Sequence, residues 1–256
     1  MSAWVLLRGL TRESRHWESF PQALCAALSG VDTGVDVVAP DLPGNGARHG
    51  ETSPDTVVGM VDAWRGQLVR QGCSPPYRLL AMSLGAMVAC EWAHRFPAEI
   101  NGMVLINTSL RPFSPFHRRL RPANYGRLLG LATDWHSPDD SERCILSLTS
   151  RRHADDALLL ARWADWRRQY PVTRANALRQ LRAAATYRAP PSAPTVPTLL
   201  LSSAGDVLVD PRCSADIAAA WALPLRTHPD AGHDLPLDDP AWVIAQIAAW
   251  RESAAG

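Results

Sequence analysis

The chain has 256 residues, 46% of them hydrophobic, and a formal net charge of +1 at pH 7. This length is enough for one compact domain with a sizeable core, and the near-neutral balance gives no sign of a nucleic-acid partner. All 26 basic residues are arginine, which excludes a lysine nucleophile or Schiff base. The five cysteines lack Cys-x-x-Cys spacing, so we expect neither a disulfide framework nor a metal site.

The N-terminus has neither the charged start nor the long apolar run of a signal peptide. No stretch approaches the ~20 apolar residues that a membrane helix needs. We therefore expect a cytoplasmic protein without a membrane span.

Apolar strand patterns alternate with helical patterns along most of the chain. The expected strands lie at residues 4–7, 35–39, 77–82, 103–107, 198–202 and 224–228. This alternation predicts an α/β fold, with a mostly parallel sheet of about six strands and helices on both faces. Asp36 lies in a strand predicted at the sheet edge, where a charge discourages pairing with another chain, although a dimer formed there stays open.

The first strand runs into a glycine loop, RGL at residues 8–10. Backbone N–H groups in such a loop can bind the negative oxygen of a tetrahedral intermediate, and loss of one donor typically costs on the order of a hundredfold in rate. We expect Leu10 and Leu84 to supply the two N–H groups of an oxyanion hole. The turn DLPGNG at residues 41–46 is predicted to shape the rim of this site.

The most informative stretch is RLLAMSLGAM, residues 78–87. An apolar strand ends at Ser83, and small residues at Ala81, Gly85 and Ala86 surround it. This pattern is typical of a nucleophile elbow, a sharp strand-to-helix turn that lifts a serine above the sheet and needs small neighbours. Taken alone, the string also fits a serine in an ordinary strand-helix turn.

Residues 110–190, called the cap segment below, have no convincing strand and contain several helical patterns. We predict a helical cap inserted into a core formed by residues 1–109 and 191–256. Large side chains expected to line a substrate pocket, from the cap and from the N-terminal loop, are Arg8, Trp17, Phe113, Phe116, Trp135, Trp163 and Trp166. Aromatic residues at helical spacing also fit a packing role.

The cap segment is locally rich in arginine, including Arg167 and Arg168. Such a surface can dock an acidic acyl carrier protein or an acyl thioester. Charge reversal at these two residues would then weaken turnover of carrier-bound substrate and spare a small ester. A solvated helix face, with nearby aspartates offsetting the charge, is the alternative.

Two further residues complete the pattern around Ser83. Asp206 follows an apolar strand in LLLSSAGD, and His233 lies in AGHD near the C-terminus. A serine hydroxyl is a weak nucleophile, so it needs a histidine base and a carboxylate that orients the histidine. Asp210 is an alternative carboxylate, but its position before Pro211 favours a helix-capping role.

In these motifs and their order, the chain resembles the alpha/beta-hydrolase superfamily, in particular small capped carboxylesterases such as the pimeloyl-carrier-protein methyl esterases. The resemblance covers nearly the whole chain and implies Ser83 as nucleophile, His233 as general base and acid, and Asp206 as its orienting partner. The chain departs from the family at Arg8, where histidine is usual, and at Ala81, where glycine is usual. It also begins at what resembles the family's third strand, so the initial antiparallel pair is expected to be missing.

These features predict a serine hydrolase that cleaves a small-molecule carboxylic ester, or a thioester, through an acyl-enzyme without a cofactor. Lactone and carbon–carbon substrates remain open. A hydrolase-shaped ligand-binding or receptor protein with little turnover is the alternative from a different class, because fold does not imply function. The sequence does not define the oligomeric state.

Overall fold

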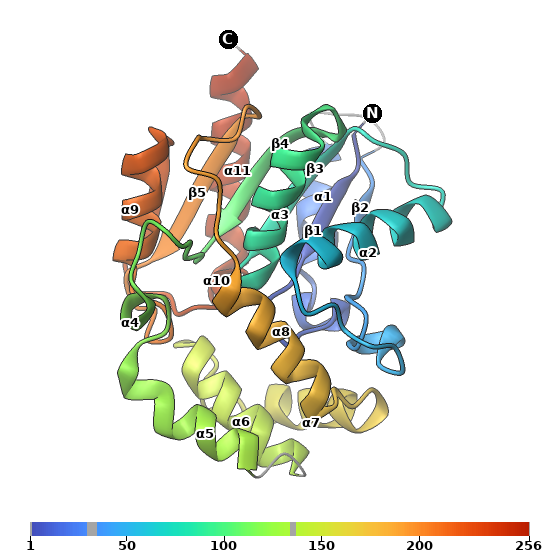
Figure 1. The fold of residues 1–256 in the computed structure, drawn as a ribbon, viewed down its shortest axis with the longest axis vertical. Coiled ribbons are helices and arrows are strands. Elements are labelled where there is room, and N and C mark those ends of the chain that lie inside the picture. The colour runs from blue at the N-terminus through green and yellow to red at the C-terminus, as the bar shows by residue number, and fades with distance from the viewer. Residues whose placement is uncertain (1, 30–34, 134–136, 256) are drawn as a thin grey trace.

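A single parallel sheet organises the chain in the computed structural model, which describes residues 2–29, 35–133 and 137–255 (Figure 1). The sheet has six strands in the order β2-β1-β3-β4-β5-β6, and every neighbouring pair is parallel. The strands are β1 (Trp4–Leu7), β2 (Val37–Val38), β3 (Tyr77–Met82), β4 (Ile100–Ile106), β5 (Thr198–Ser203) and β6 (Leu225–His228). The predicted α/β fold with about six parallel strands is confirmed.

Five long helices cover the two faces of this sheet. Helices α2 (Val57–Arg70), α3 (Leu84–Arg95) and α9 (Arg212–Trp221) pack on one face. Helices α1 (Phe20–Ser29) and α11 (Pro240–Ala255) pack on the other. The short elements around them are η1 (Ser14–Trp17), η2 (Gly46–Arg48), η3 (Pro97–Glu99) and α10 (Leu235–Asp238).

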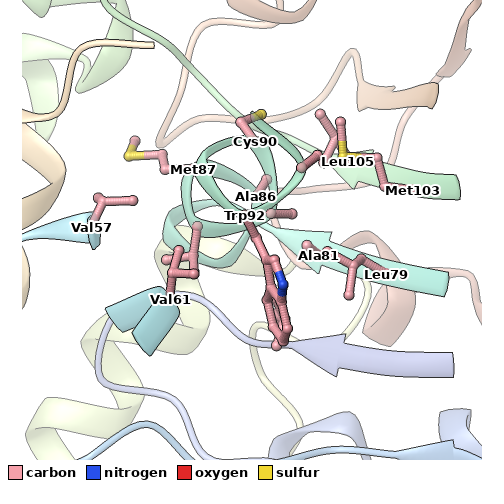
Figure 2. Packing of buried hydrophobic residues seen from close by; sticks show 14 of the residues in the cluster. Val57, Val61, Leu79, Ala81, Ala86, Met87, Cys90, Trp92, Met103 and Leu105 are labelled. Atoms are coloured by element: carbon pink, nitrogen blue, oxygen red, sulfur yellow. The ribbon is translucent and has the colours of Figure 1, made fainter. Parts of the chain in front are cut away.

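The strands are buried on both faces, which explains why their sequences are continuously apolar. In β3, Leu79 and Ala81 point toward α2 and α3, whereas Leu80 and Met82 point toward α1 and α11. Figure 2 shows the first of these clusters gathered around α3, with Cys90 among its buried side chains. Burial of one Val, Leu, Ile, Phe or Met side chain contributes roughly 1.5–3 kcal/mol to stability, so many such side chains together hold the strands in place.

Two strand boundaries differ from the prediction. β4 begins at Ile100, which pairs with Tyr77, instead of at residue 103. Asn101 and Gly102 are weak strand formers and hid this start in the sequence. β2 is only two residues long, and it forms the sheet edge as predicted.

The cap segment contributes helices between β4 and β5. They are α4 (Phe116–Arg119), η4 (Pro122–Asn124), α5 (Tyr125–Thr133), α6 (Pro138–Thr149), α7 (Ala157–Gln169) and α8 (Arg174–Thr186). Among its described residues the segment adds no strand to the sheet. In Figure 1 α5, α6 and α7 lie together below the core. Leu146 of α6 packs with Leu159 and Trp163 of α7 in a small separate cluster.

Side-chain caps fix where three of these helices begin. Ser137, Asp156 and Thr173 each accept a hydrogen bond from a backbone N–H in the first turn of α6, α7 and α8 respectively. Within the described residues, no helix combines the length and the apolar character needed to cross a bilayer.

Candidate active site

Ser83 occupies a strained turn between β3 and α3. Its backbone has φ 53° and ψ −117°, a conformation that non-glycine residues rarely adopt. The surroundings hold it in place, because Ser83 N donates to Ile106 O at 3.0 Å and Thr108 Oγ1 donates to Ser83 O at 3.3 Å. A strained strand-to-helix turn of this kind is what a nucleophile elbow requires.

The two glycines near Ser83 are there for steric reasons. A Cβ atom at Gly85 would lie 2.3 Å from Leu7 O, so no side chain fits where α3 crosses the end of β1. A Cβ atom at Gly9 would lie 3.3 Å from Ser83 Cβ, which shows that the loop after β1 passes directly beside the serine. Leu10 follows Gly9 in this loop and lines the same cavity as Ser83. Leu84 is the first residue of α3, where backbone N–H groups have no acceptor within the helix.

Asp206 and His233 are in direct contact. His233 Nδ1 lies 2.7 Å from Asp206 Oδ2, and both side chains are almost fully buried. Asp206 Oδ1 accepts hydrogen bonds from Leu208 N and Val209 N at 2.8 and 2.9 Å, which fixes the carboxylate. Burial alone lowers the pKa of His233, but attraction to the Asp206 carboxylate and their hydrogen bond outweigh burial, so the pKa is raised.

Asp210, the alternative carboxylate, is engaged elsewhere. It forms an ion pair with Arg212 at 2.5 Å and accepts from Arg212 N at 3.0 Å at the start of α9. The hydrogen bond from Arg212 holds the pKa of Asp210 at about 2. Asp210 therefore stabilises a helix N-terminus and does not contact His233.

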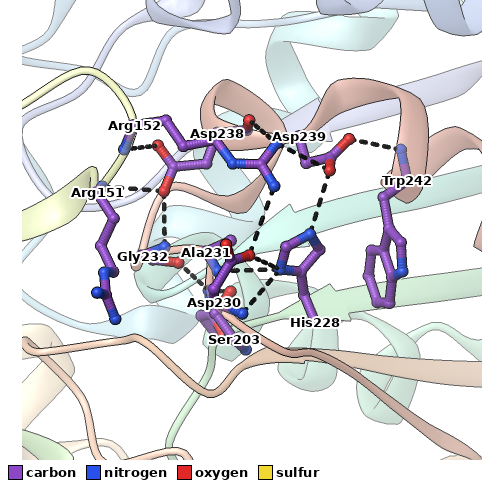
Figure 3. Close-up of polar contacts among 11 residues, drawn as sticks. Arg151, Arg152, Ser203, His228, Asp230, Ala231, Gly232, Asp238, Asp239 and Trp242 are labelled. Carbon is purple, nitrogen blue, oxygen red and sulfur yellow. Dashed lines mark hydrogen bonds and ion pairs between the residues drawn. The ribbon is translucent and has the colours of Figure 1, made fainter.

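A polar network supports the loop that carries His233 (Figure 3). The Asp238 carboxylate accepts from Gly232 N at 2.6 Å and from Arg151 N at 3.0 Å, so it joins this loop to the cap segment. On the other side, Asn107 Nδ2 donates to His233 O at 2.8 Å. These contacts fix the backbone of the loop that carries His233.

Ser83 and His233 open into one cavity of about 570 Å³ between the core and the cap segment. Leu10 and Leu84 also line it. Its other walls are mostly apolar and include the exposed side chains of Phe116, Tyr125, Leu178 and Leu181. Exposed apolar residues at a cavity mouth favour an apolar ligand. In the described part of the chain, no cluster of three or more His, Cys, Asp or Glu side chains can hold a metal ion.

Arg8 takes part in a buried ion pair with Asp234. Its guanidinium donates to both oxygens of Asp234, at 2.5 and 3.1 Å, and lies 4.7 Å from the ring centre of Trp17. Both charged side chains are about 5% exposed or less. Because Asp234 follows His233, this pair ties the loop after β1 to the histidine loop.

The other predicted pocket residues divide between the cavity and the packing interior. Phe116 and Arg8 line the cavity. Trp17 instead packs against Phe20 beneath the loop after β1, and Phe113 packs against Trp221.

Two cap tryptophans also pack away from the cavity lining. Trp163 is fully buried in the cluster between α6 and α7, and the Arg15 guanidinium lies 5.1 Å from the ring centre of Trp166. Trp135 lies outside the described residues. Helical spacing identified large buried residues but did not show which face of each helix meets the cavity.

Several of the cap arginines form ion pairs with nearby carboxylates. Arg168 forms ion pairs with Asp139 and Asp165, and the exposed Arg182 pairs with Asp55. Arg167, which we expected on a docking face, is 8% exposed and binds Glu142 at 3.0 Å. This corrects the use of Arg167 as a surface residue, since it is unable to reach a docked partner.

Asn107 and Asp238 are site-supporting residues that sequence analysis missed. Asn107 follows β4 and has a positive φ of 45°, while Asp238 lies in the Asp-Asp-Pro run before α11. A polar residue directly after a buried parallel strand was the available signal for Asn107, because such strand ends meet at one edge of the sheet.

Solved structures show the same architecture at low sequence identity. An esterase from Thermogutta terrifontis, solved with malate bound, is 20% identical with a TM-score of 0.76, covering 99% of this chain and 90% of that one. An enol-lactonase from Burkholderia xenovorans LB400 is 18% identical with a TM-score of 0.78, covering 98% and 91%. An esterase from Rhodococcus sp. ECU1013 is 17% identical with a TM-score of 0.69, covering 98% and 90%. At these identities the likeness shows a shared fold.

A search among curated proteins gave no match. The family model described as "Alpha/beta hydrolase family" matches residues 4–246, nearly the whole chain. This match includes every strand of the sheet together with Ser83, Asp206 and His233. The chain therefore belongs to the alpha/beta hydrolase family.

Proposed function

We propose that this protein hydrolyses carboxylic esters through a covalent acyl-enzyme on Ser83. The observation that carries the proposal is the 2.7 Å contact between His233 Nδ1 and Asp206 Oδ2 in the cavity that also holds the strained Ser83. A serine, a histidine and a buried carboxylate in this chain order are the parts of a nucleophilic triad.

Each residue has a defined role in the proposed reaction. His233 accepts the hydroxyl proton while Ser83 Oγ attacks the ester carbonyl, and the backbone N–H groups of Leu10 and Leu84 bind the resulting oxyanion. When the carbon–oxygen bond breaks, His233 gives that proton to the departing alcohol. His233 then takes a proton from water, whose oxygen attacks the acyl-enzyme. As the bond to Ser83 Oγ breaks and the acid leaves, His233 returns this proton to Ser83 Oγ.

The cap segment is the proposed determinant of substrate choice. Residues 110–190 supply the apolar side chains over Ser83, including Leu148, Leu178 and Leu181, and these suit an apolar acyl chain. A thioester fits the same mechanism, whereas the ion pairs of Arg168 and Arg182 offset two of the charges that docking of an acidic carrier protein would use.

The test is hydrolysis of 4-nitrophenyl esters from acetate to decanoate by the wild-type protein and by Ser83→Ala. We expect multiple turnovers by the wild type and loss of at least about a thousandfold in kcat for the variant. Ser29→Ala is the matched control, because Ser29 is an exposed residue at the end of α1. Ligand binding without turnover in the wild type would instead support a receptor.

A further inference from the structure

Helix α8 of the cap segment uses different faces for the cavity and for the core. Leu178 and Leu181 on one face line the cavity. Another face carries two amides, Asn176 and Gln180, whose residues are 5% and 0% exposed. Both amides form hydrogen bonds with loops of the core. In Figure 1 α8 lies between the core and helices α5, α6 and α7, so it connects the two parts.

Gln180 binds the loop after β1 directly. Its Oε1 accepts a hydrogen bond from Thr11 N at 2.8 Å. Its Nε2 donates to Asn45 Oδ1 at 2.7 Å and to Ser53 Oγ at 3.0 Å. Thr11 follows Leu10, whose backbone N–H is a donor in the proposed oxyanion hole. A side chain of the cap segment therefore holds the loop that is proposed to stabilise the negative charge of the intermediate.

Neighbouring backbone carbonyls fix the orientation of the Gln180 amide. Arg12 O only accepts hydrogen bonds, so the Asn45 atom 2.9 Å from it is Nδ2, and Asn45 Oδ1 faces Gln180. Ser53 Oγ donates to Pro43 O at 2.6 Å and therefore accepts from Gln180 Nε2. The amide nitrogen is thus directed to these two oxygens, which leaves Oε1 for the backbone N–H of the loop. A fully matched buried network of this kind favours one conformation.

Thr11 has a backbone conformation that needs such support. Its φ is 58°, which is unfavourable for a β-branched residue. Arg12 N donates to Gly9 O at 3.3 Å, so residues 9–12 form a tight turn with Thr11 at the third position. Reversal of the Leu10–Thr11 peptide would give a turn without a positive φ. Gln180 opposes this reversal, because the Leu10 carbonyl oxygen would then face the acceptor Oε1.

We propose that Gln180 is a positioning residue for the oxyanion hole, which holds the strained Leu10–Thr11 peptide and thereby keeps the Leu10 N–H in place. This inference rests on the proposed function, in which that N–H binds the oxyanion. A donor stabilises a developing charge only when it is in position beforehand, so a shift of the turn lowers the rate of the chemical step more than substrate binding. The cap segment then contributes to catalysis as well as to substrate choice.

Two substitutions at Gln180 test this role with 4-nitrophenyl butyrate as substrate. Gln180→Met keeps the length of the side chain and removes its amide, so we expect kcat to fall at least about tenfold while KM changes less than about threefold. Gln180→Glu is the conservative variant. Burial favours its protonated carboxyl group, which keeps an acceptor for Thr11 N and one O–H donor, so kcat should stay within about threefold of the wild type.

Asn176→Leu is the matched control on the same helix. Asn176 Oδ1 accepts from Ser53 N at 2.9 Å and Nδ2 donates to Glu51 O at 2.9 Å, so this amide anchors α8 to the core away from the loop after β1. Asn176→Leu and Gln180→Met should both lower Tm by roughly 2–10 °C, because each leaves a buried backbone group without its partner. Only Gln180→Met should lower kcat. Equal kcat values in the two variants overturn the proposal.

Amide hydrogen exchange separates this inference from the proposed function, because it needs no turnover. We expect exchange in residues 9–12 to be at least about tenfold faster in Gln180→Met than in the wild type, and unchanged in Asn176→Leu. If exchange responds in this way but the wild type hydrolyses no ester, the proposed function fails and the support of the turn by Gln180 stands. If esters are hydrolysed and Gln180→Met retains the wild-type kcat, the positioning role fails alone.

Discussion

Arg8 connects two loops of the candidate active site. In this chain its guanidinium is bound to Asp234 in a buried two-point contact between the loop beside Ser83 and the loop that carries His233. A permanently charged, planar group suits this role, because it binds both carboxylate oxygens at once.

Replacing Arg8 by glutamine should destabilise the protein strongly. The substitution leaves the Asp234 carboxylate buried without a counter-ion, so we expect a loss of about 3–5 kcal/mol in the free energy of unfolding. Urea denaturation measures this loss. Arg95→Gln at an exposed ion pair is the comparison and should cost about 0–1 kcal/mol. A similar small cost for both variants would show that the Arg8–Asp234 contact is not formed.

The raised pKa of His233 sets the expected pH dependence. In the proposed mechanism only the neutral imidazole accepts the Ser83 proton, so kcat/KM should fall as the pH drops through a value above 6.5, the ordinary pKa of histidine. Asp206→Asn removes the attraction that raises this pKa, so its acidic limb should move to lower pH, with kcat reduced by roughly 10⁴. An unchanged limb in this variant would mean that another group controls it.

At the scale of elements, the contact between the end of β1 and the start of α3 leaves no room for a side chain at Gly85. Helix α3 approaches the strand closely because Gly85 lacks a Cβ atom, and this approach places Ser83 above the sheet. The strained backbone of Ser83 is therefore supported by packing of the two elements.

Gly85→Ala should push these elements apart. Its Cβ would lie 2.3 Å from Leu7 O and 2.7 Å from Arg8 O, so we expect a loss of about 1–3 kcal/mol in stability and a marked loss of kcat. Gly126→Ala in α5 is the matched control, because its Cβ would have no neighbour within 4 Å. That control should be neutral or stabilising by up to about 1 kcal/mol. Retained activity in Gly85→Ala would argue against a close approach at this point.

At the scale of the whole molecule, buried ion pairs join the core and the cap segment. Glu142 of α6 binds Arg12 from the core and Arg167 of α7. This link spans the wall of the cavity, so the stability of the cap segment and the charge of the site depend on the same carboxylate.

Glu142→Gln keeps the size of the side chain and removes its charge. Arg12 and Arg167 then lose the charged group that both of them bind, and we expect a loss of about 3–5 kcal/mol in the free energy of unfolding. Asp55→Asn is the matched control, since Asp55 joins core and cap through the exposed Arg182 and should cost about 0–1 kcal/mol. Denaturation followed by circular dichroism and by tryptophan fluorescence compares the two. Equal costs for both variants would contradict a stabilising role for the buried link.

Short-range pattern was enough to predict the sheet. β1, β3 and β5 are continuous apolar runs because both of their faces are buried, and this was visible in the sequence. Ser83, Asp206 and His233 follow strands whose ends lie at the same edge of the parallel sheet, and Ser83 and His233 line one cavity there. The small residues around Ser83 similarly reflect a steric demand that acts within a few residues.

Tertiary structure alone decided which long-range partners and faces meet. The pairing of Arg8 with Asp234 joins residues 226 positions apart, and the sharing of Glu142 by Arg12 and Arg167 depends on how α6 and α7 pack against the core. The same packing turned Trp163 into the interior and Phe116 toward the cavity, although both are large aromatic residues of the cap segment. Local sequence fixes periodicity and turns, whereas the rotation and crossing of helices result from contacts between distant segments, so the charge and the shape of the cavity were not predictable from the sequence.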